Sequence, residues 1–91
     1  MSQIKIEENA FEALQLGSEG AMVHVVQKSL IHLEYNISEN SIFDEEMNTI
    51  VKEFQEKRGI VIDGIISIET MQELDKAYLE QQKKKKRKTK K

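Results

Sequence analysis

Apolar residues recur at helical spacing in three separate stretches of the chain. The stripes are Val23, Val26, Leu30 and Leu33; then Met47, Ile50, Val51 and Phe54; then Met71, Leu74 and Tyr78. Steps of three and four residues place such side chains on one face of a helix, with polar residues on the other face. The pattern therefore predicts three amphipathic helices. The first is expected over about residues 21–34, with Val25 and Ile31 partly covered by other elements.

Capping residues mark where these helices should begin and end. Ser18 is a candidate N-cap for the first helix, Asp44 for the second and Ser67 for the third. Gly59 suits the left-handed position that ends the second helix. The third helix is expected to fray within residues 80–86.

The connecting segments are short and rich in turn-forming residues. Residues 16–20 predict a turn, and residues 35–41 a polar loop. Residues 60–66, IVIDGII, admit a β-hairpin around Asp63-Gly64 or a tight connection whose apolar residues fill the space between helices. The connection is favoured because neither flank leaves room for a third strand. Upstream, Ala10, Phe11 and Leu14 fit one face of a short helix.

A weak internal repeat relates residues 41–47 to residues 64–70, with a shift of 23 positions. Each copy has a small residue, two apolar residues, a capping residue and acidic residues at a helix start. Two loop-and-helix units of this kind are expected to pack as a pseudo-symmetric pair.

Length and composition limit the architecture to one small domain. The chain has 91 residues, 38% of them hydrophobic, with no cysteine and no proline. We expect an all-α three-helix bundle over residues 4–80, followed by a basic tail over residues 81–91. Its core is predicted to contain Val26, Leu30, Ile50, Phe54, Ile65 and Leu74.

Charge divides the chain into an acidic body and a basic tail. The sixteen acidic residues all lie between Glu7 and Glu80, and only six basic residues precede the tail, so the body carries a net charge of −10. The tail carries eight positive charges and no apolar residue, so it is expected to be disordered in free solution. It is either a solubilising appendage, a segment that folds loosely over the acidic body, or an anchor for polyanions. The anchor residues would be Lys83, Lys84, Lys85, Lys86, Arg87, Lys88, Lys90 and Lys91.

The order of residues across residues 11–78 resembles the small helical peptidoglycan-binding domain found beside cell-wall hydrolases. The similar residues in the first half are Leu14, Gly17, Ser18, Gly20, Val23, Val26, Gln27, Leu30, Leu33 and Tyr35. Those in the second half are Phe43, Val51, Phe54, Gln55, Gly59, Ile60, Asp63, Gly64, Ile65, Thr70 and Leu74. The resemblance implies a three-helix fold that binds wall polymer without cleaving it.

The chain departs from that family mainly in its loops. The family usually has glycine at the positions of Glu34, Ser41 and Ser67, threonine at Met47 and proline at Ile68. The fold tolerates such changes more easily than a shallow ligand groove does.

The sequence shows no catalytic motif and implies no cofactor. It lacks a zinc-protease motif, a nucleophile elbow, a phosphate-binding loop and a cysteine nucleophile. His24 and His32 lie too far apart on one helix to share a metal, so surface or boundary positions are expected for both. Asp44, Glu45 and Glu46 are interpreted as helix-stabilising acids rather than a cation site. The chain is predicted not to be an enzyme and to contain no metal site.

Candidate ligand residues are taken from the loops and from one aromatic side chain. Tyr35, beside a polar loop, is a candidate platform for a sugar or peptide, although packing is its alternative role; Tyr78 is expected in the core. The other candidates are Asn40, Ser41, Phe43, Asp63 and Gly64. Gln27 and Gln55 are expected to hydrogen-bond neighbouring loop backbone, with ligand contact as the alternative.

Two functions remain open at this point. The first is a noncatalytic module that binds peptidoglycan or another cell-wall polymer, with the tail adding affinity for polyanions. The alternative is a docking protein of a virion, spore or intracellular assembly that holds an acidic protein surface or nucleic acid through its tail. No secretory signal or transmembrane stretch is visible, so synthesis in the cytoplasm is expected, with wall, spore or virion association following release or assembly. The pattern does not indicate an oligomeric state.

Overall fold

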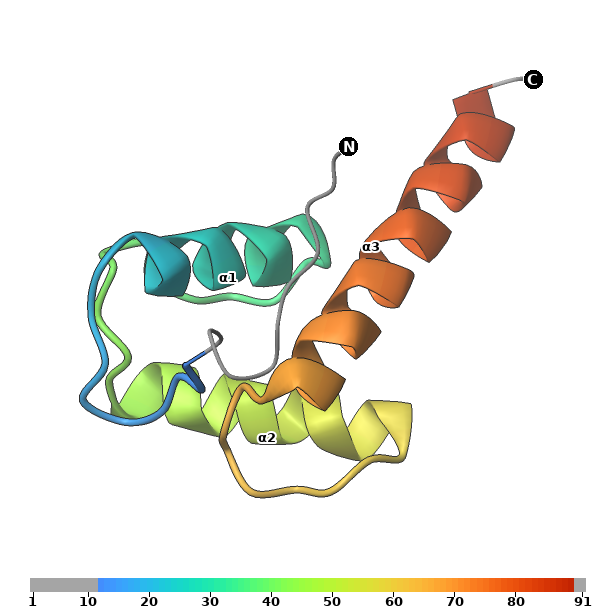
Figure 1. Ribbon diagram of the computed structural model, residues 1–91. Coiled ribbons are helices and arrows are strands. Elements are labelled where there is room, and N and C mark those ends of the chain that lie inside the picture. Colours follow the sequence, from blue (N-terminus) through green and yellow to red (C-terminus); the bar gives the residue numbers. More distant parts are fainter. Residues whose placement is uncertain (1–11, 90–91) are drawn as a thin grey trace, which may run out of the picture.

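Three helices make up the regular structure of the chain. The computed structural model describes the backbone of residues 12–89 and the side chains of residues 12–82. The helices are α1 (Ala21–His32), α2 (Glu45–Arg58) and α3 (Ile68–Thr89), and the described backbone contains no β-strand. In Figure 1, α1 and α2 lie one above the other, and α3 runs obliquely past them and projects beyond α1. The predicted all-α, three-helix fold is confirmed.

The core lies where the three apolar stripes meet. Val23, Val26 and Leu30 of α1 pack with Met47, Val51 and Phe54 of α2 and with Leu74 of α3. Ile50 was expected there, but it lies at the edge of the core and is only partly buried. The α2–α3 loop contributes Ile66 instead of the expected Ile65. The shift by one residue follows from the backbone pairing of Ile66, which turns its side chain inward.

The third helix has a different phase from the one predicted. Ala77 is buried beside Leu74, whereas Tyr78 is 37% exposed, so the expected core position of Tyr78 is wrong. A small side chain allows helices to approach closely, so alanine is well suited to the side of α3 that faces the core. The helix continues to Thr89, beyond the expected end within residues 80–86. Glutamine, lysine and arginine are good helix formers, and no glycine or proline interrupts this stretch.

The helix caps follow local chemistry with one exception. The Asp44 side chain accepts a hydrogen bond from the Met47 N–H at 3.1 Å, and Gly59 ends α2 in the left-handed conformation, as predicted. The Ser67 hydroxyl lies 3.4 Å from the Thr70 N–H at the start of α3. Ser18, by contrast, does not cap α1; its hydroxyl accepts a hydrogen bond from the Gln15 N–H, and Gly20 occupies the cap position.

The segment before α1 joins both loops between the helices. Leu14 forms a two-way backbone pair with Ile66 in the α2–α3 loop. Gly17, Ser18 and Gly20 bond to the backbone of Phe43 and Ser41 in the α1–α2 loop. Leu14 is therefore in extended backbone rather than in the expected short helix; Ala10 and Phe11 lie outside the described residues.

The α2–α3 loop forms a tight connection and not a hairpin, as favoured from the sequence. Its apolar residues do not all fill the interior, however, since Val61 and Ile62 are 64% and 52% exposed. Val25 and Ile31 on α1 are likewise exposed rather than partly covered. The turn brings Asp63 and Gly64 back against α2, which leaves the preceding two residues at the outside of the bend.

Within residues 12–89, two non-glycine residues occupy left-handed backbone, and both are positions at which the family usually has glycine. Glu34 has φ 75° at the end of α1, and Ser41 has φ 66° in the loop before α2. A side chain in this region costs about 1–2 kcal/mol. Glu34 and Ser41 therefore strain the backbone at two positions where the family usually has glycine.

We expect Glu34→Gly and Ser41→Gly each to raise the free energy of unfolding by about 1 kcal/mol, because relief of strain outweighs the greater freedom of the unfolded chain. In a domain of this size, that corresponds to a rise in Tm of about 4–8 °C by thermal denaturation. The matched control is Ser38→Gly, in the same loop at negative φ, which should lower the Tm. A lower Tm for both test variants would show that neither position is strained.

Candidate functional site

The predicted loop residues are arranged around two buried glutamines. Gln27 of α1 accepts hydrogen bonds from the N–H groups of Asn40 and Ser41, at 3.0 and 2.8 Å. Its amide group donates to the side-chain oxygen of Asn40 and to the Ile42 carbonyl, at 3.1 and 3.0 Å. We call this arrangement the Gln27 cradle.

The second loop repeats the arrangement around α2. Gln55 accepts from the N–H groups of Asp63 and Gly64, at 3.0 and 2.9 Å. Its amide group donates to an Asp63 carboxylate oxygen and to the Ile65 carbonyl, both at 3.0 Å, and to the Thr70 hydroxyl at 3.2 Å. This is the Gln55 cradle. The structural role expected for both glutamines, which uses donor and acceptor together, is confirmed.

The loop residues of the two cradles obey the 23-residue repeat, whereas Gln27 and Gln55 themselves lie 28 positions apart. Asn40 corresponds to Asp63, Ser41 to Gly64 and Ile42 to Ile65, and both members of each pair have the same bonding role. The copies differ at Met47 and Thr70: the Gln27 amide group meets the Met47 sulfur at 3.6 Å, whereas Gln55 reaches a hydroxyl. Sulfur is a weak acceptor, so the first cradle is held less firmly at this point.

These contacts define what the loop candidates can offer a ligand. The backbone groups of Asn40, Ser41, Asp63 and Gly64 face their glutamines, and Phe43 is only 1% exposed. A Cβ placed on Gly64 would collide with the Asn48 side chain. These residues therefore shape the loops, and their direct contact with a ligand stays a prediction.

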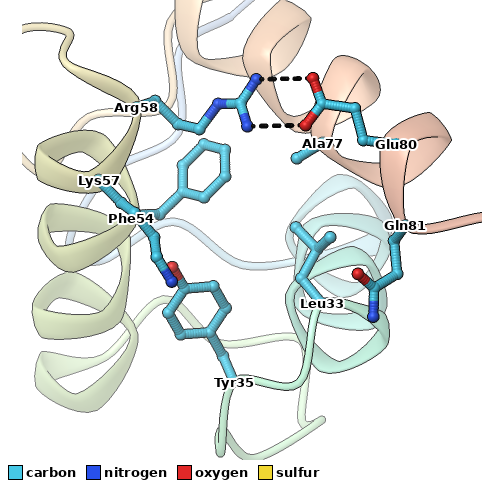
Figure 2. Close-up of a pocket in the computed structure, with 8 residues that line it drawn as sticks. All are labelled: Leu33, Tyr35, Phe54, Lys57, Arg58, Ala77, Glu80 and Gln81. Carbon is cyan, nitrogen blue, oxygen red and sulfur yellow. Dashed lines mark hydrogen bonds and ion pairs between the residues drawn. The ribbon is translucent and has the colours of Figure 1, made fainter. Parts of the chain in front are cut away.

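Tyr35 lies apart from both cradles, in a pocket between the ends of α1 and α2 and the side of α3. The pocket holds about 190 Å³ and is shown in Figure 2. It is lined by Leu33, Tyr35, Phe54, Lys57, Arg58, Ala77, Glu80 and Gln81. We call it the Tyr35 pocket. None of the other five predicted ligand residues lines it.

The ring of Tyr35 is fixed by its neighbours. It meets Phe54 edge to face, with ring centroids 6.4 Å apart and planes at 78°, and the Lys57 ammonium lies 5.9 Å from its centroid. Burial, together with the charge of Glu53, raises the pKa of the Tyr35 hydroxyl, so it stays protonated at neutral pH. One side chain thus offers an apolar ring face and a hydroxyl that can donate or accept.

A charged network forms another wall of the Tyr35 pocket. Arg58 donates to Glu73 at 3.0 Å and to both carboxylate oxygens of Glu80 at 3.2 and 3.5 Å, and Figure 2 shows the pair with Glu80. The hydrogen bonds that Arg58 donates to Glu80 raise the pKa of the Arg58 guanidinium, and the bond that Arg58 donates to Glu73 lowers the pKa of Glu73. Both groups therefore remain charged near neutral pH and hold α2 against α3.

Sequence analysis did not identify Lys57, Arg58 or Glu80 as site residues. Lys57 and Arg58 lie in the last turn of α2, where positive charge interacts favourably with the helix dipole, and that position by itself does not indicate a site. Glu73 and Glu80 lie seven residues apart, two turns along one face of α3, and that spacing was the available signal for a facing cation.

The remaining predictions about site residues concern ions and the tail. Within residues 12–82, no group of three or more His, Cys, Asp and Glu side chains is placed to share a metal ion. His24 and His32 are both partly buried, as expected, and His24 bonds to Glu39 at 2.7 Å.

Of the predicted polyanion-binding residues, Lys83–Lys88 continue the backbone of α3, while Lys90 and Lys91 lie outside the described residues. None of the described helices is both long and apolar enough to cross a membrane.

Comparison with known proteins gives consistent matches to one family. The family model "Putative peptidoglycan binding domain" matches residues 19–74. The carboxy-terminal processing protease CtpA of Bacillus subtilis is 34% identical over 66 residues, which are 72% of this chain and 14% of the protease. This chain thus corresponds to a small part of that relative.

Two solved structures show the same fold. The SleB N-terminal domain is 29% identical with a TM-score of 0.71, and the match covers 74% of this chain and 93% of that domain. A fused zinc-dependent amidase/peptidase and peptidoglycan-binding-domain protein of Clostridium acetobutylicum is 33% identical with a TM-score of 0.68. That match covers 69% of this chain and 28% of the fused protein.

Proposed function

The chain belongs to the peptidoglycan binding domain family, and on that premise we propose that its helical body is a noncatalytic module that holds the protein on bacterial cell-wall peptidoglycan. The proposal is supported by the family match over residues 19–74 and by two loops that are each held by a buried glutamine. It is supported also by relatives that carry such a domain beside a protease or an amidase. In this proposal the module supplies attachment and no bond cleavage.

The observation that carries the proposal at residue level is the Tyr35 pocket. A partly exposed aromatic ring beside charged side chains is suited to a wall polymer, which alternates sugar rings with peptides that carry carboxylates and amines. The ring face can pack against a sugar or an apolar peptide group. Lys57 and Arg58 supply positive charge at the rim, and Glu80 and Gln81 supply acceptors.

The loop candidates have an indirect role in this proposal. The cradles fix the course of the two loops, and none of the cradle residues lines the Tyr35 pocket, although Gln55 directly follows Phe54, which does. The basic tail begins at Gln81, which lines the pocket, so we propose that the tail adds affinity for polyanions such as teichoic acid. Association with a wall, spore or virion would follow from such binding.

Sedimentation with purified bacterial sacculi tests the proposal. The full chain is expected to sediment with sacculi, and Tyr35→Ala to bind about ten-fold more weakly, since loss of an aromatic contact of about 1–1.5 kcal/mol corresponds to that factor. Tyr35→Phe should retain most binding because it keeps the ring. Ile62→Ala, an exposed apolar residue away from the pocket, is the control.

Folding of each variant is checked by circular dichroism, because Tyr35 also packs against Phe54. Equal binding by Tyr35→Ala and the parent would remove the Tyr35 pocket from the proposal. Failure of the folded parent chain to sediment would overturn wall binding and favour docking on an acidic protein surface or nucleic acid.

A further inference from the structure

A second hollow lies between α1 and α3 and shares no residue with the Tyr35 pocket. It is lined by Val25, Lys28, Ser29 and His32 of α1 and by Asp75 and Tyr78 of α3, and it holds about 460 Å³. We call it the α1–α3 groove. Its volume is within the range of about 300–1,000 Å³ that is typical of small-ligand sites.

The polar groups of this groove are left without partners. The Nε2 atom of His32 is buried and has no hydrogen bond, the one such side-chain atom among residues 12–82. Native proteins seldom leave buried polar atoms unpaired, and such an atom commonly indicates an absent water, ion or ligand. The ring is held in place by Tyr78, with centroids 4.3 Å apart and planes tilted by 34°.

Opposite charges face the same groove without forming an ion pair. Lys28 on α1 and Asp75 on α3 make no salt bridge or side-chain hydrogen bond to any described residue, unlike Arg58 and Glu73 elsewhere on the surface. A cation and an anion held apart on two helices can be bridged by a ligand that carries the complementary charges. Val25, 47% exposed, and the ring of Tyr78 provide apolar surface beside them.

We propose that the α1–α3 groove binds a short zwitterionic peptide, one with a free ammonium at one terminus and a free carboxylate at the other. The peptide carboxylate pairs with Lys28, its ammonium pairs with Asp75, and small apolar side chains such as methyl groups pack on Val25 and Tyr78. His32 lines the groove, so the environment of its ring should change when the peptide binds. The source of the peptide, a fragment of the wall polymer with both termini free, rests on the proposed function, whereas the binding chemistry does not.

The probe is the dipeptide D-alanyl-D-alanine, titrated into the full chain and followed by NMR. Resonances of Val25, Lys28, His32, Asp75 and Tyr78 are expected to shift together. N-acetyl-D-alanyl-D-alanine lacks the ammonium, and D-alanyl-D-alanine amide lacks the carboxylate. Each analogue should bind at least about ten-fold more weakly, since a hydrogen bond between charged groups is stronger than a neutral one.

Variants of the two charged residues test the same pairing from the side of the protein. Lys28→Gln should remove the preference for the free carboxylate, and Asp75→Asn the preference for the free ammonium. The charge-swapped double variant Lys28→Asp/Asp75→Lys should bind the dipeptide more tightly than either Lys28→Asp or Asp75→Lys alone does. The dipeptide would then bind in the opposite orientation. Lys52→Gln, an exposed lysine outside the groove, is the matched control and should bind as the parent chain does.

The inference is overturned if the dipeptide shifts no groove resonance at about 10 mM, or if both analogues and all variants bind equally well. Its failure is distinguishable from failure of the proposed function. Sedimentation with sacculi that survives Lys28→Gln/Asp75→Asn, together with absent dipeptide binding by the parent, would remove the groove alone. Dipeptide binding without any sedimentation would support the groove and remove wall attachment.

Discussion

Gln55→Leu is expected to lower the free energy of unfolding by at least about 3 kcal/mol, more than any exposed substitution in this domain. The leucine side chain fills a similar volume but satisfies neither the Asp63 N–H nor the buried Gly64 N–H, and it withdraws the donor from Ile65 and Thr70. Each buried group left unpaired costs about 1–3 kcal/mol. A domain of this size has about 5–14 kcal/mol of stability in total, so the loss is a large share.

The same substitution elsewhere separates the cradle from any general effect of leucine. Gln72→Leu, on an exposed position of α3, should change stability by no more than about 0.5 kcal/mol. Gln27→Leu should lower the free energy of unfolding by slightly less than Gln55→Leu does. The reason is that Gln27 contacts the Met47 sulfur, a weaker acceptor than the Thr70 hydroxyl that Gln55 contacts. Urea denaturation of the three variants measures these differences. If Gln55→Leu and Gln72→Leu unfolded at the same urea concentration, the cradle would contribute nothing beyond its volume.

The parts of the fold that were predictable are those fixed by local chemistry. The cap at Asp44, the left-handed end at Gly59 and the stripe of Val23, Val26 and Leu30 depend on residues within a few positions of one another. The loops are harder to predict, because IVIDGII has no periodicity to show which residues point inward. Among the apolar residues of this stretch, only Ile66 is fully buried. It pairs with Leu14, which lies more than fifty positions earlier in the chain.

The roles of the site residues could be predicted from the sequence better than the positions of their partners. The donor-and-acceptor role of Gln27 and Gln55 follows from the amide group itself. Their partners lie 8 to 20 residues away along the chain, so the loops had to be folded before the cradles could be seen. Arg58 reaches Glu80 over 22 residues, and local spacing does not show which of the many acids it meets.

Removal of the basic tail is expected to have the largest effect on binding to polyanions. Deletion of residues 83–91 removes eight positive charges and leaves the body with its sixteen acidic residues, so the remaining protein should repel polyanions. If all eight positive charges contact duplex DNA, counterions are released, and the logarithm of the affinity falls with the logarithm of the salt concentration with a slope of about −7. A protein with such a slope loses affinity by about 10³–10⁵ between 50 and 200 mM salt. The deletion should remove a binding component of that size.

Binding through the folded body should respond differently to salt. The Tyr35 pocket combines ring packing with hydrogen bonds, which depend less on salt than contacts between exposed charges do. At about 1 M salt, the screening length falls to about 3 Å, and only the body component should persist. Sedimentation with sacculi and binding to duplex DNA, measured for the full and truncated chains across a salt series, separate the two components. Unchanged affinity and salt slope after truncation would make the tail a solubilising appendage, whereas loss of all binding, including that to sacculi, would show that the body is not the recognition element.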